Sequence, residues 1–511
     1  MSRSEHWNTP REIKRAFPES TEAGCAAGPV IYEENGKKYI DDSESHAAVV
    51  GRTGKGKSQC CSLPFVREVI AKGESLVMLD PKGEGYKCCS GVIPDNYQKF
   101  CIDFRVPRQS PDSWNPLTVP YRLFHSENPD DVDVACSMVS EFWTGVYPRD
   151  ETDDPFWTDS AAQYAKGLTY GLFELASEEY VNLDSISVMM EQSEQRYAGP
   201  SNLVKEFHNM LPSDSLAKRN LAPYVTAPNE TRGSMHTTAA SGLEVFSRSK
   251  GLMKMLGRNT FDIQNIDVGR PFALFVITPD ETNVYDSLAG LLISQVTQHL
   301  IRVSHEIGGP LPIRVNIVLE ELGSVGKCIP TLPNLMVAGR SRNLRIMLIL
   351  QSFSQLTQVY GKSQAETIES SVGLTIGFST NNWETLNEWA RRCGEKYVKP
   401  NGPNGPIVKE QLITASQLAA MPPGTALIMV DSQYKFIAQL PFYYQMYKDA
   451  EKPVAKAAPF EETYGHKAIN FEKMVKDMKL ESKPITNIDE IIARLDKKIE
   501  ELAKEEEEKN S

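Results

Sequence analysis

The 511-residue chain is poor in cysteine, and its cysteines lack the spacings that serve as metal ligands. Nine are present, with adjacent pairs at Cys60–Cys61 and Cys88–Cys89 and no C-x-x-C. An odd count without metal-type spacing indicates reduced thiols, which is typical of a cytoplasmic protein. We therefore expect neither a zinc site nor a disulfide framework.

Long apolar runs are missing as well. A membrane-spanning helix needs about 20 mostly apolar residues, whereas the nearest approach, DSLAGLLISQVTQHLIRV at 286–303, is interrupted by Ser, Gln, Thr and His. The first residues, MSRSEHWNTPREIKRAF, lack the apolar core of a signal peptide. We expect a buried helix at 286–303 and no membrane span.

An excess of positive charge is also absent, because 55 Lys and Arg face 67 Asp and Glu, for a formal net charge of −12. Phosphate binding depends on local lysine and arginine, so a general DNA-coating surface is excluded. A small basic patch or a charged channel stays compatible with this balance. The length exceeds what one core supports and predicts two or three domains.

The most informative stretch is AAVVGRTGKGKSQCCSLPF, residues 47–65, which matches the phosphate-loop pattern G-x-x-x-x-G-K-[ST]. HAAVV before it predicts a buried strand, and SQCCSLPFVREVIAKG after it predicts a helix. Glycines let backbone N–H groups converge on phosphate oxygens at the helix N-terminus. Lys57 would reach the β- and γ-phosphates and Ser58 would bind Mg²⁺, so we expect ATP as ligand. The predicted nucleotide-binding residues are Gly51, Thr53, Gly54, Lys55, Gly56, Lys57 and Ser58.

Hydrolysis needs an acid for the metal and a group that orients water. RVNIVLEELG offers both, because Glu320 and Glu321 follow the apolar strand Val315–Leu319. We predict Glu320 as the Mg²⁺ ligand and Glu321 as the residue that positions or activates water. Asp80, at the end of the strand in SLVMLDPKGEGY, is the second choice for the metal. An exposed acidic pair at a strand end is the alternative interpretation.

Two further features lie around the next apolar strand. Gln351, in LILQSFSQL, would emerge at the same sheet edge and contact the γ-phosphate or the water. An exposed loop amide explains its spacing equally well. VAGRSRNLR offers Arg340, Arg342 and Arg345, any of which could reach a neighbouring subunit as an arginine finger. Surface arginines are the more common case.

The order of the segments predicts an α/β protein: a P-loop NTPase with a mostly parallel sheet, an inserted all-α domain and a C-terminal helical tail. We place a lead-in with a hairpin turn at Asn35-Gly36 in residues 1–45. The motor domain follows at 46–154 and 263–447, and the insertion at 155–262. A linker and an amphipathic C-terminal helix occupy 448–511.

In the tail, apolar residues recur at helical spacing after a potential N-cap at Asn487, which predicts a helix that docks on the body or pairs with a partner. These residues are Ile488, Ile491, Leu495, Ile499 and Leu502. Basic residues are frequent in the insertion, which indicates either a solvated surface or a cap that contacts DNA. They are Lys205, Lys218, Arg219, Arg232, Arg248, Lys250 and Lys254.

Several separate motifs together resemble the TraG/TraD family, the coupling proteins of type IV secretion in bacterial conjugation. They are GRTGKGKS, LDPKGE, WNPL, DPFWTDSA, VLEELGSVGKCIP, AGRSRNLRIMLILQSFSQLTQVYG and MPPGTALIMV, and they cover roughly residues 30–447. The resemblance implies a RecA-like motor that assembles as a homo-hexamer around a channel. It also implies that Gln351 senses phosphate and that Arg340 is the arginine-finger candidate.

By the same resemblance, the partners would be a relaxase with its single-stranded DNA, a secretion-channel ATPase and inner-membrane channel proteins. The chain departs from the family in having Glu320 where Asp is usual, and in lacking the usual N-terminal transmembrane helices. We therefore expect a cytoplasmic protein that a partner, such as a small membrane-anchor subunit, recruits to the cytoplasmic face of the membrane.

Two alternatives to a conjugative DNA translocase stay open. One is a related FtsK/HerA-like pump, against which DPKGE and LILQSFSQLTQVYG speak. The other is a nucleotide-gated adaptor that recruits cargo without pumping, because binding and hydrolysis use different groups. Turnover of ATP with and without single-stranded DNA separates them.

Overall fold

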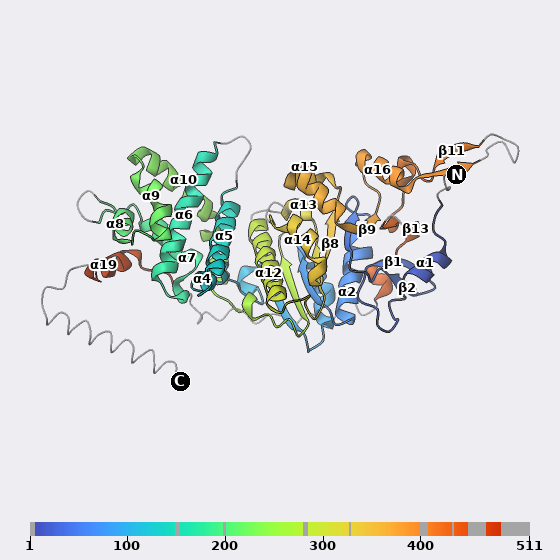
Figure 1. Cartoon of the computed structure of the whole chain (residues 1–511), viewed down its shortest axis with the longest axis horizontal. Helices are drawn as coiled ribbons and strands as arrows, with labels where there is room; N and C mark the ends of the chain where they lie inside the picture. Colours follow the sequence, from blue (N-terminus) through green and yellow to red (C-terminus); the bar gives the residue numbers. More distant parts are fainter. Residues whose placement is uncertain are drawn as a thin grey trace. The chain divides into compact units, whose positions relative to one another are not determined.

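The computed structural model describes residues 6–148, 154–197, 201–279, 285–325, 329–398, 407–431, 434–447 and 467–481. The chain divides into two compact units, whose helices and strands are labelled in Figure 1. The first consists of Met1–Pro148 and Glu244–His466, and the second of Arg149–Leu243 and Lys467–Ser511. Residues 244–262, which the sequence placed in the insertion, lie in the first unit.

The first unit is built on a nine-stranded sheet of order β13-β12-β9-β3-β8-β7-β4-β6-β5. The seven strands from β9 to β5 are parallel to their neighbours, and β12 and β13 add an antiparallel edge. This confirms the mostly parallel sheet. The strands are β3 (His46–Val50), β4 (Ser75–Leu79), β5 (Gln98–Asp103), β6 (Phe272–Ile277), β7 (Val315–Leu319), β8 (Leu344–Leu350), β9 (Val372–Gly377), β12 (Thr425–Val430) and β13 (Tyr434–Gln439).

The sequences of the central strands are almost continuously apolar because both faces of these strands are buried. Every residue of β3, β4, β6, β7 and β8 is buried, as expected for parallel strands covered on both faces. Because β3, β8, β7 and β4 are consecutive neighbours and parallel, their carboxyl ends share one edge, where open α/β sheets bind ligands. The motifs that follow these strands therefore meet.

Helices cover both faces of the sheet (Figure 1). A core on one face joins α2 and α3 to α1 and to the hairpin β1–β2, whose turn residues Asn35 and Gly36 have φ of 54° and 79°, as a tight hairpin requires. The elements of this face are α1 (Pro10–Ala16), β1 (Val30–Glu34), β2 (Lys37–Ile40), α2 (Leu63–Ala71) and α3 (Glu84–Cys89). Those of the opposite face are α12 (Asp286–Glu306), α13 (Leu322–Val325), α14 (Leu332–Ala338) and α15 (Ser354–Ser370).

Further helices and two strands complete the first unit. They are α4 (Thr118–Phe124), α5 (Pro129–Val146), α11 (Lys250–Met255), α16 (Trp383–Cys393), β10 (Glu395–Val398), β11 (Val408–Gln411), α17 (Ala415–Ala419) and α18 (Tyr443–Met446). The helix predicted at 286–303 is α12, which is buried along much of its length. Among the described helices, none has the length and apolar character needed to cross a bilayer.

His46, the first residue of β3, is a buried histidine with both ring nitrogens engaged. Its Nε2 lies 2.9 Å from the carbonyl of Met336, and its Nδ1 accepts from the Ile346 N–H at 3.1 Å. This pairing fixes one neutral tautomer, with the proton on Nε2. Burial lowers the pKa of His46 to about 4, from an ordinary value of 6.5.

Because the pKa is lower in the folded state, the unfolded chain takes up more protons, and stability falls as the pH drops from 6.5 towards 4. Between pH 7 and pH 5 we expect His46 to remove about 2 kcal/mol of the free energy of unfolding. Urea unfolding of the wild type and of His46→Gln at both pH values measures this, since only the wild-type pH dependence contains the histidine. Equal pH dependence in both proteins would contradict the prediction.

Among its described residues, the second unit forms helices and no strands, as predicted for the insertion. Its helices are α6 (Pro155–Leu175), α7 (Leu183–Gln192), α8 (Leu203–Met210), α9 (Leu216–Thr226) and α19 (Phe471–Glu481), together with α10 (Asn229–Ser247), which runs across the 243/244 boundary. α6 packs closely on α9 and α8, because Gly167 lies against Leu221 and Gly171 against Phe207. The rings of Tyr164 and Tyr224 stack with centroids 3.8 Å apart.

Helix α19, which the sequence did not single out, belongs to this unit and packs on α7 and α8. Phe471 and Val475 are fully buried, and the Phe471 ring meets that of Phe207 at 5.2 Å between centroids. Lys467 pairs with Glu179 at 2.7 Å. The tail helix predicted from Ile488 to Leu502 lies outside the described residues.

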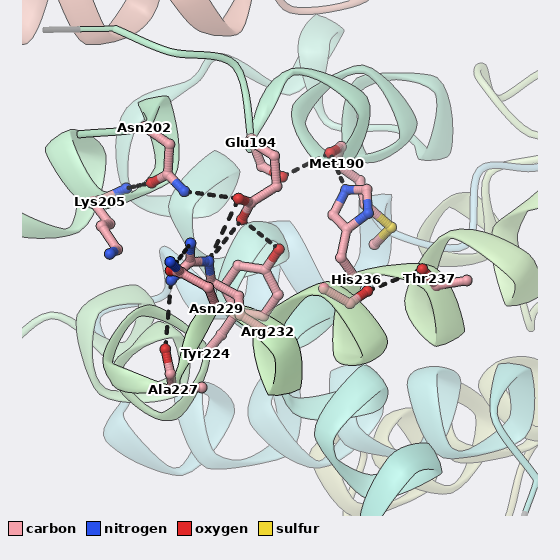
Figure 2. A network of polar contacts seen from close by, with 12 residues as sticks. Met190, Glu194, Asn202, Lys205, Tyr224, Ala227, Asn229, Arg232, His236 and Thr237 are labelled. Atoms are coloured by element: carbon pink, nitrogen blue, oxygen red, sulfur yellow. Dashed lines mark hydrogen bonds and ion pairs between the residues drawn. The ribbon is translucent and has the colours of Figure 1, made fainter. Parts of the chain in front are cut away.

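A polar network around Glu194 ties the ends of four helices of this unit together (Figure 2). The Glu194 carboxylate accepts from Arg232 Nε at 3.1 Å, Tyr224 Oη at 2.8 Å and Asn202 Nδ2 at 2.9 Å. Arg232 is 8% exposed and also donates to Asn229 Oδ1 at 2.9 Å. Removing one partner of such a pair leaves a buried charge without compensation.

We therefore expect Glu194→Ala to destabilise the helical unit by about 2 kcal/mol, at the lower end for a buried pair because Glu194 is partly exposed. Hydrogen exchange of the amides of α7 to α10 measures this opening locally. Glu191→Ala, on the exposed surface of α7, is the matched control and should change exchange little. Equal protection in both variants would show that the network does not stabilise the unit.

This network bears on the basic residues of the insertion. Arg232 is buried against Glu194, Arg248 pairs with Glu244 at 2.8 Å, and Lys218 Nζ donates to the Leu211 carbonyl at 2.6 Å. Arg232 is therefore part of the helical core and not of a surface that could contact DNA. The DNA-contact hypothesis stays a prediction for the six other basic residues that the sequence singled out in the insertion.

Candidate nucleotide site

The phosphate loop connects β3 to the helix that begins at Ser58, as the sequence predicted. At two of its positions, a side chain would collide with neighbouring atoms or strain the backbone, so glycine is required. A Cβ on Gly51 would lie 2.6 Å from Cβ of Phe378, and Gly56 has φ of 102° with Cys60 and Gly424 close by. The backbone can adopt this path only without side chains at these positions.

The side chains of Lys57 and Lys55 donate hydrogen bonds to different parts of the structure. Lys57 Nζ donates to the Gly51 carbonyl, so its ammonium spans the loop. Burial lowers the pKa of Lys57, and the carboxylates of Glu321 and Glu320 oppose this shift. Lys55 Nζ instead donates to the Met421 carbonyl at 2.9 Å. Of the two side chains, only that of Lys57 is placed for phosphate.

The loop is braced by the turn at 421–424, which belongs to the MPPGTALIMV motif. The Gly424 N–H donates to the Lys55 carbonyl at 3.1 Å, in addition to the Lys55–Met421 contact. Thr53 and Gly54, at the tip of the loop, are exposed. The backbone around Lys55 is thus fixed by the 421–424 turn, while Thr53 and Gly54 at the tip are accessible to a ligand.

The helix after the loop starts with a π turn, Ser58–Ser62, before α2 begins. Ser62 Oγ donates to Glu320 Oε1, and the Ser58 hydroxyl lies near enough to this carboxyl to help lower its pKa. Single π turns inside helices are frequent at functional sites. The contact joins the phosphate loop to the end of β7, two segments about 260 residues apart in sequence.

Glu320 is 6% exposed, and burial raises its pKa to about 7 in spite of the bonds from Ser62 and Ser58. The carboxyl of Asp80, at the end of β4, lies close enough to contribute to this rise. Burial raises the pKa of Asp80 to about 6. Its oxygens accept from the N–H groups of Gly85 at 3.1 Å and Tyr86 at 2.8 Å.

These contacts separate the two candidates for the metal ligand. Asp80 uses both carboxylate oxygens to hold the start of α3, whereas Glu320 is held by Ser62 and lies near Ser58, the residue expected to bind Mg²⁺. One hydroxyl and one carboxylate suit Mg²⁺, which keeps several waters and takes phosphate oxygens as further ligands. Within the described residues, no group of three or more His, Cys, Asp or Glu could hold a metal alone.

Glu321 extends from the same strand end, but it is exposed. Its φ is 50°, which is unusual for a residue with a side chain. Its carboxylate lies 3.8 Å from Lys82 Nζ, on the loop after β4. Glu321 is therefore available to solvent beside the phosphate loop, as a residue that orients water must be.

Gln351 follows β8, between the strands that carry the phosphate loop and the acidic pair. Its N–H donates to Gln355 Oε1 at 2.9 Å and its carbonyl accepts from Thr380 Oγ1 at 3.2 Å, so its backbone is fixed while the side chain is exposed. Gln351 thus lies at the predicted edge.

The three arginines before β8 differ in position. Arg340 is exposed, at the end of β8 opposite to Gln351, so it does not join the site of its own chain. Arg342 contacts the Ala338 carbonyl at 2.8 Å and His305 at 3.0 Å. Arg345 is buried and donates to Asp41 and to the carbonyls of Ala27, Asp41 and Ser45. The interpretation of Arg345 as a finger candidate is wrong, because the residue anchors the lead-in to the sheet.

Sequence reasoning missed Ser62 and Lys82. Ser62 lies one helical turn after Ser58, and this spacing on the first turns of the helix was a usable signal. Lys82 stands in the quoted LDPKGE motif, but its relation to Glu321 depends on β4 and β7 being neighbours. Strand order could not be read from the motif itself.

Comparison with known proteins identifies the family to which this chain belongs. The model described as Type IV secretory system Conjugative DNA transfer matches residues 1–486. The chain is 22% identical over 361 residues to a probable conjugal transfer protein TraG of Sinorhizobium fredii, covering 70% of this chain and 53% of that protein. It is 22% identical over 256 residues to the coupling protein VirD4 of Bartonella quintana, covering 48% of this chain and 38% of that protein. The chain thus spans about half the length, or less, of these curated relatives.

Solved structures agree on the fold. The unbound conjugative coupling protein TrwB, lacking its first 70 residues, superposes with a TM-score of 0.64 at 17% identity, covering 89% of this chain and 96% of that one. TrwB in complex with ADP and Mg²⁺ gives 0.61 at 17% identity, covering 90% and 96%. The predicted RecA-like fold with a helical domain is confirmed by this likeness.

Proposed function

This chain belongs to the type IV secretory system conjugative DNA transfer family, and from that premise we propose that it is a coupling ATPase. It binds ATP with Mg²⁺, hydrolyses it, and uses the free energy to move a relaxase-bound DNA strand to the secretion channel. The complexes of TrwB with ADP and Mg²⁺ and with a non-hydrolysable ATP analogue support the choice of ligand.

One observation carries the proposal: Ser62, one helical turn after Ser58, donates a hydrogen bond to Glu320, so the helix of the phosphate loop is joined to the acidic end of β7. A phosphate loop alone supports binding, whereas a loop joined to an acidic strand end also supports hydrolysis. Glu320 has one methylene more than the Asp usual in the family. Ser62, which holds its carboxyl from the second turn of the helix, accommodates this extra length.

In the proposed reaction, the residues divide the work by position. The N–H groups of the loop and the ammonium of Lys57 bind the phosphates. Ser58 with Glu320 would hold Mg²⁺, which would neutralise charge on the phosphate oxygens. Glu321 orients the attacking water, and Gln351 contacts the γ-phosphate or the water from the neighbouring strand end. Displacement of the Gly51 carbonyl from Lys57 Nζ accompanies phosphate binding.

The remaining roles follow from family membership and stay proposals. Arg340 lies far from its own phosphate loop, which suits an arginine finger acting on a neighbouring copy in a homo-hexamer. The partners we propose are a relaxase with single-stranded DNA, the secretion-channel ATPase and inner-membrane channel proteins. A small membrane-anchor subunit would hold the protein at the cytoplasmic face of the membrane.

Steady-state ATP turnover of the purified full chain, alone, with single-stranded DNA and with duplex DNA, tests the function. We expect turnover that single-stranded DNA increases at least severalfold. Tight nucleotide binding with negligible turnover under all three conditions would replace the pump by an adaptor. Stimulation by duplex DNA only would indicate an FtsK/HerA-like pump instead.

A further inference from the structure

Lys82 brings a second cation to the nucleotide site. It lies on the loop between β4 and α3, and its Nζ is 3.8 Å from Glu321 Oε1. The two residues follow β4 and β7, which are hydrogen-bonded neighbours in the sheet. The pair therefore bridges two adjacent strand ends at the edge that carries the phosphate loop.

Both members of this pair have strained backbones. Lys82 has φ of 85° and Glu321 has φ of 50°, and they are two of only five non-glycine residues with positive φ in the described part of the chain. Such a conformation costs about 1–2 kcal/mol per residue, and glycine would avoid it. Strain of this kind concentrates at functional sites, so a lysine at this position points to a use for its side chain.

Hydrogen bonds with residues that follow β5 and β6 fix the backbone of Lys82. Its N–H donates to the Thr278 carbonyl, after β6, at 3.2 Å, and its carbonyl accepts from Arg105 Nη1. Arg105 is held by Asp103, at the end of β5, through Nε at 3.0 Å and Nη2 at 2.7 Å. The position of the lysine is thus set by β4, β5 and β6 together.

The electrostatics place Lys82 within the site. Lys57 has its pKa lowered mainly by burial; Glu321 and Glu320 oppose the shift, and Lys82 adds to it. The charges of Lys57, Lys82, Glu320 and Glu321 therefore interact with one another beside the phosphate loop. An ordinary exposed ion pair would contribute about 0–1 kcal/mol to stability, which does not account for the strained backbone or the tether.

We infer that Lys82 is a positioning residue for hydrolysis: its ammonium holds the Glu321 carboxylate beside the phosphate loop, and the Asp103–Arg105 pair sets where the ammonium stands. This rests on the proposed function, in which Glu321 orients water. Lys82 itself does not bind the nucleotide. Loss of Lys82 frees the carboxylate to swing away, and a displacement of about 1 Å in such a group can lower a rate up to 100-fold.

Two variants of Lys82 test the inference in the full-length protein. We expect Lys82→Met to lower kcat for ATP about tenfold and to leave KM and the affinity for a fluorescent ATP analogue within about twofold. Lys82→Arg, which keeps the charge, should recover most of the rate. Lys87→Met, at an exposed position of α3 five residues away, is the matched control and should behave as the wild type.

Arg105→Ala separates positioning from direct phosphate contact. Arg105 holds the Lys82 carbonyl, so we expect kcat to fall severalfold with unchanged affinity. If Lys82→Met weakened nucleotide binding and left kcat intact, Lys82 would be a phosphate ligand and the inference would be wrong. Normal kinetics of Lys82→Met, with active wild type, would also overturn it. A wild type without turnover would remove the proposed function first, and this role of Lys82 with it.

Discussion

Lys57→Ala is expected to lower the affinity for ATP on the order of 100-fold and to abolish turnover. The ammonium spans the loop to the Gly51 carbonyl in a partly buried position, where water screens charge poorly. Hydrogen bonds between charged groups contribute about 1.5–3 kcal/mol each, and a triphosphate offers the lysine at least two oxygens. Titration with a fluorescent ATP analogue measures the affinity, and phosphate release measures turnover.

Lys72→Ala is the control for this experiment, because Lys72 caps the far end of α2 and contacts the Glu22 carbonyl and Cys25. It should bind nucleotide as the wild type does. Thermal unfolding of both variants without nucleotide separates lost binding from lost fold. Wild-type affinity in Lys57→Ala would show that the loop does not bind phosphate in this protein.

Glu321→Gln is expected to lower turnover about 100-fold or more and to leave nucleotide affinity nearly unchanged. The amide keeps the size of the side chain but cannot accept the proton of the attacking water, and such proton transfer contributes about 10²–10⁴ to a rate. Because Glu321 is exposed beside the loop and pairs with Lys82, binding should persist. Single-turnover measurement with saturating ATP isolates the chemical step from nucleotide release.

Glu366→Gln, on the exposed face of α15, is the charge-matched control and should hydrolyse ATP at the wild-type rate. A Glu321→Gln protein that retained wild-type turnover would move the role of water activation to another group. Loss of binding and turnover together would instead indicate that Glu321 shapes the pocket.

Much of the site could be predicted because its signals are local. The phosphate loop needs glycines at Gly51 and Gly56 and a lysine at Lys57 within eight residues, and the flanking strand and helix follow from short apolar patterns. The acidic pair stands out because charge ends an apolar strand. The hairpin at Asn35-Gly36 was predictable for the same reason, since its turn depends on two adjacent residues.

What failed were assignments that depend on residues distant in sequence. Charge patterns place Arg232 and Arg345 on the surface, but each is buried against a carboxylate, Glu194 and Asp41, from another part of the chain. Helix α9 and the first half of α10 were not singled out because their segments are rich in Ser, Thr, Asn and Gly or interrupted by Pro223, which favour loops in isolation. Tertiary packing overrides these preferences.

The sequence by itself determined that this chain carries a phosphate loop and an acidic strand end, because each is specified by a few consecutive residues. The mostly parallel sheet followed from the alternation of strands and helices along the chain. Only the tertiary structure decided that Ser62 holds Glu320, that Lys82 faces Glu321, and that α19 returns to the helical unit. These contacts depend on strand order and on helix packing between segments far apart in the chain. Such long-range pairing is fixed by the burial of apolar surface as a whole, and no short stretch of residues encodes it.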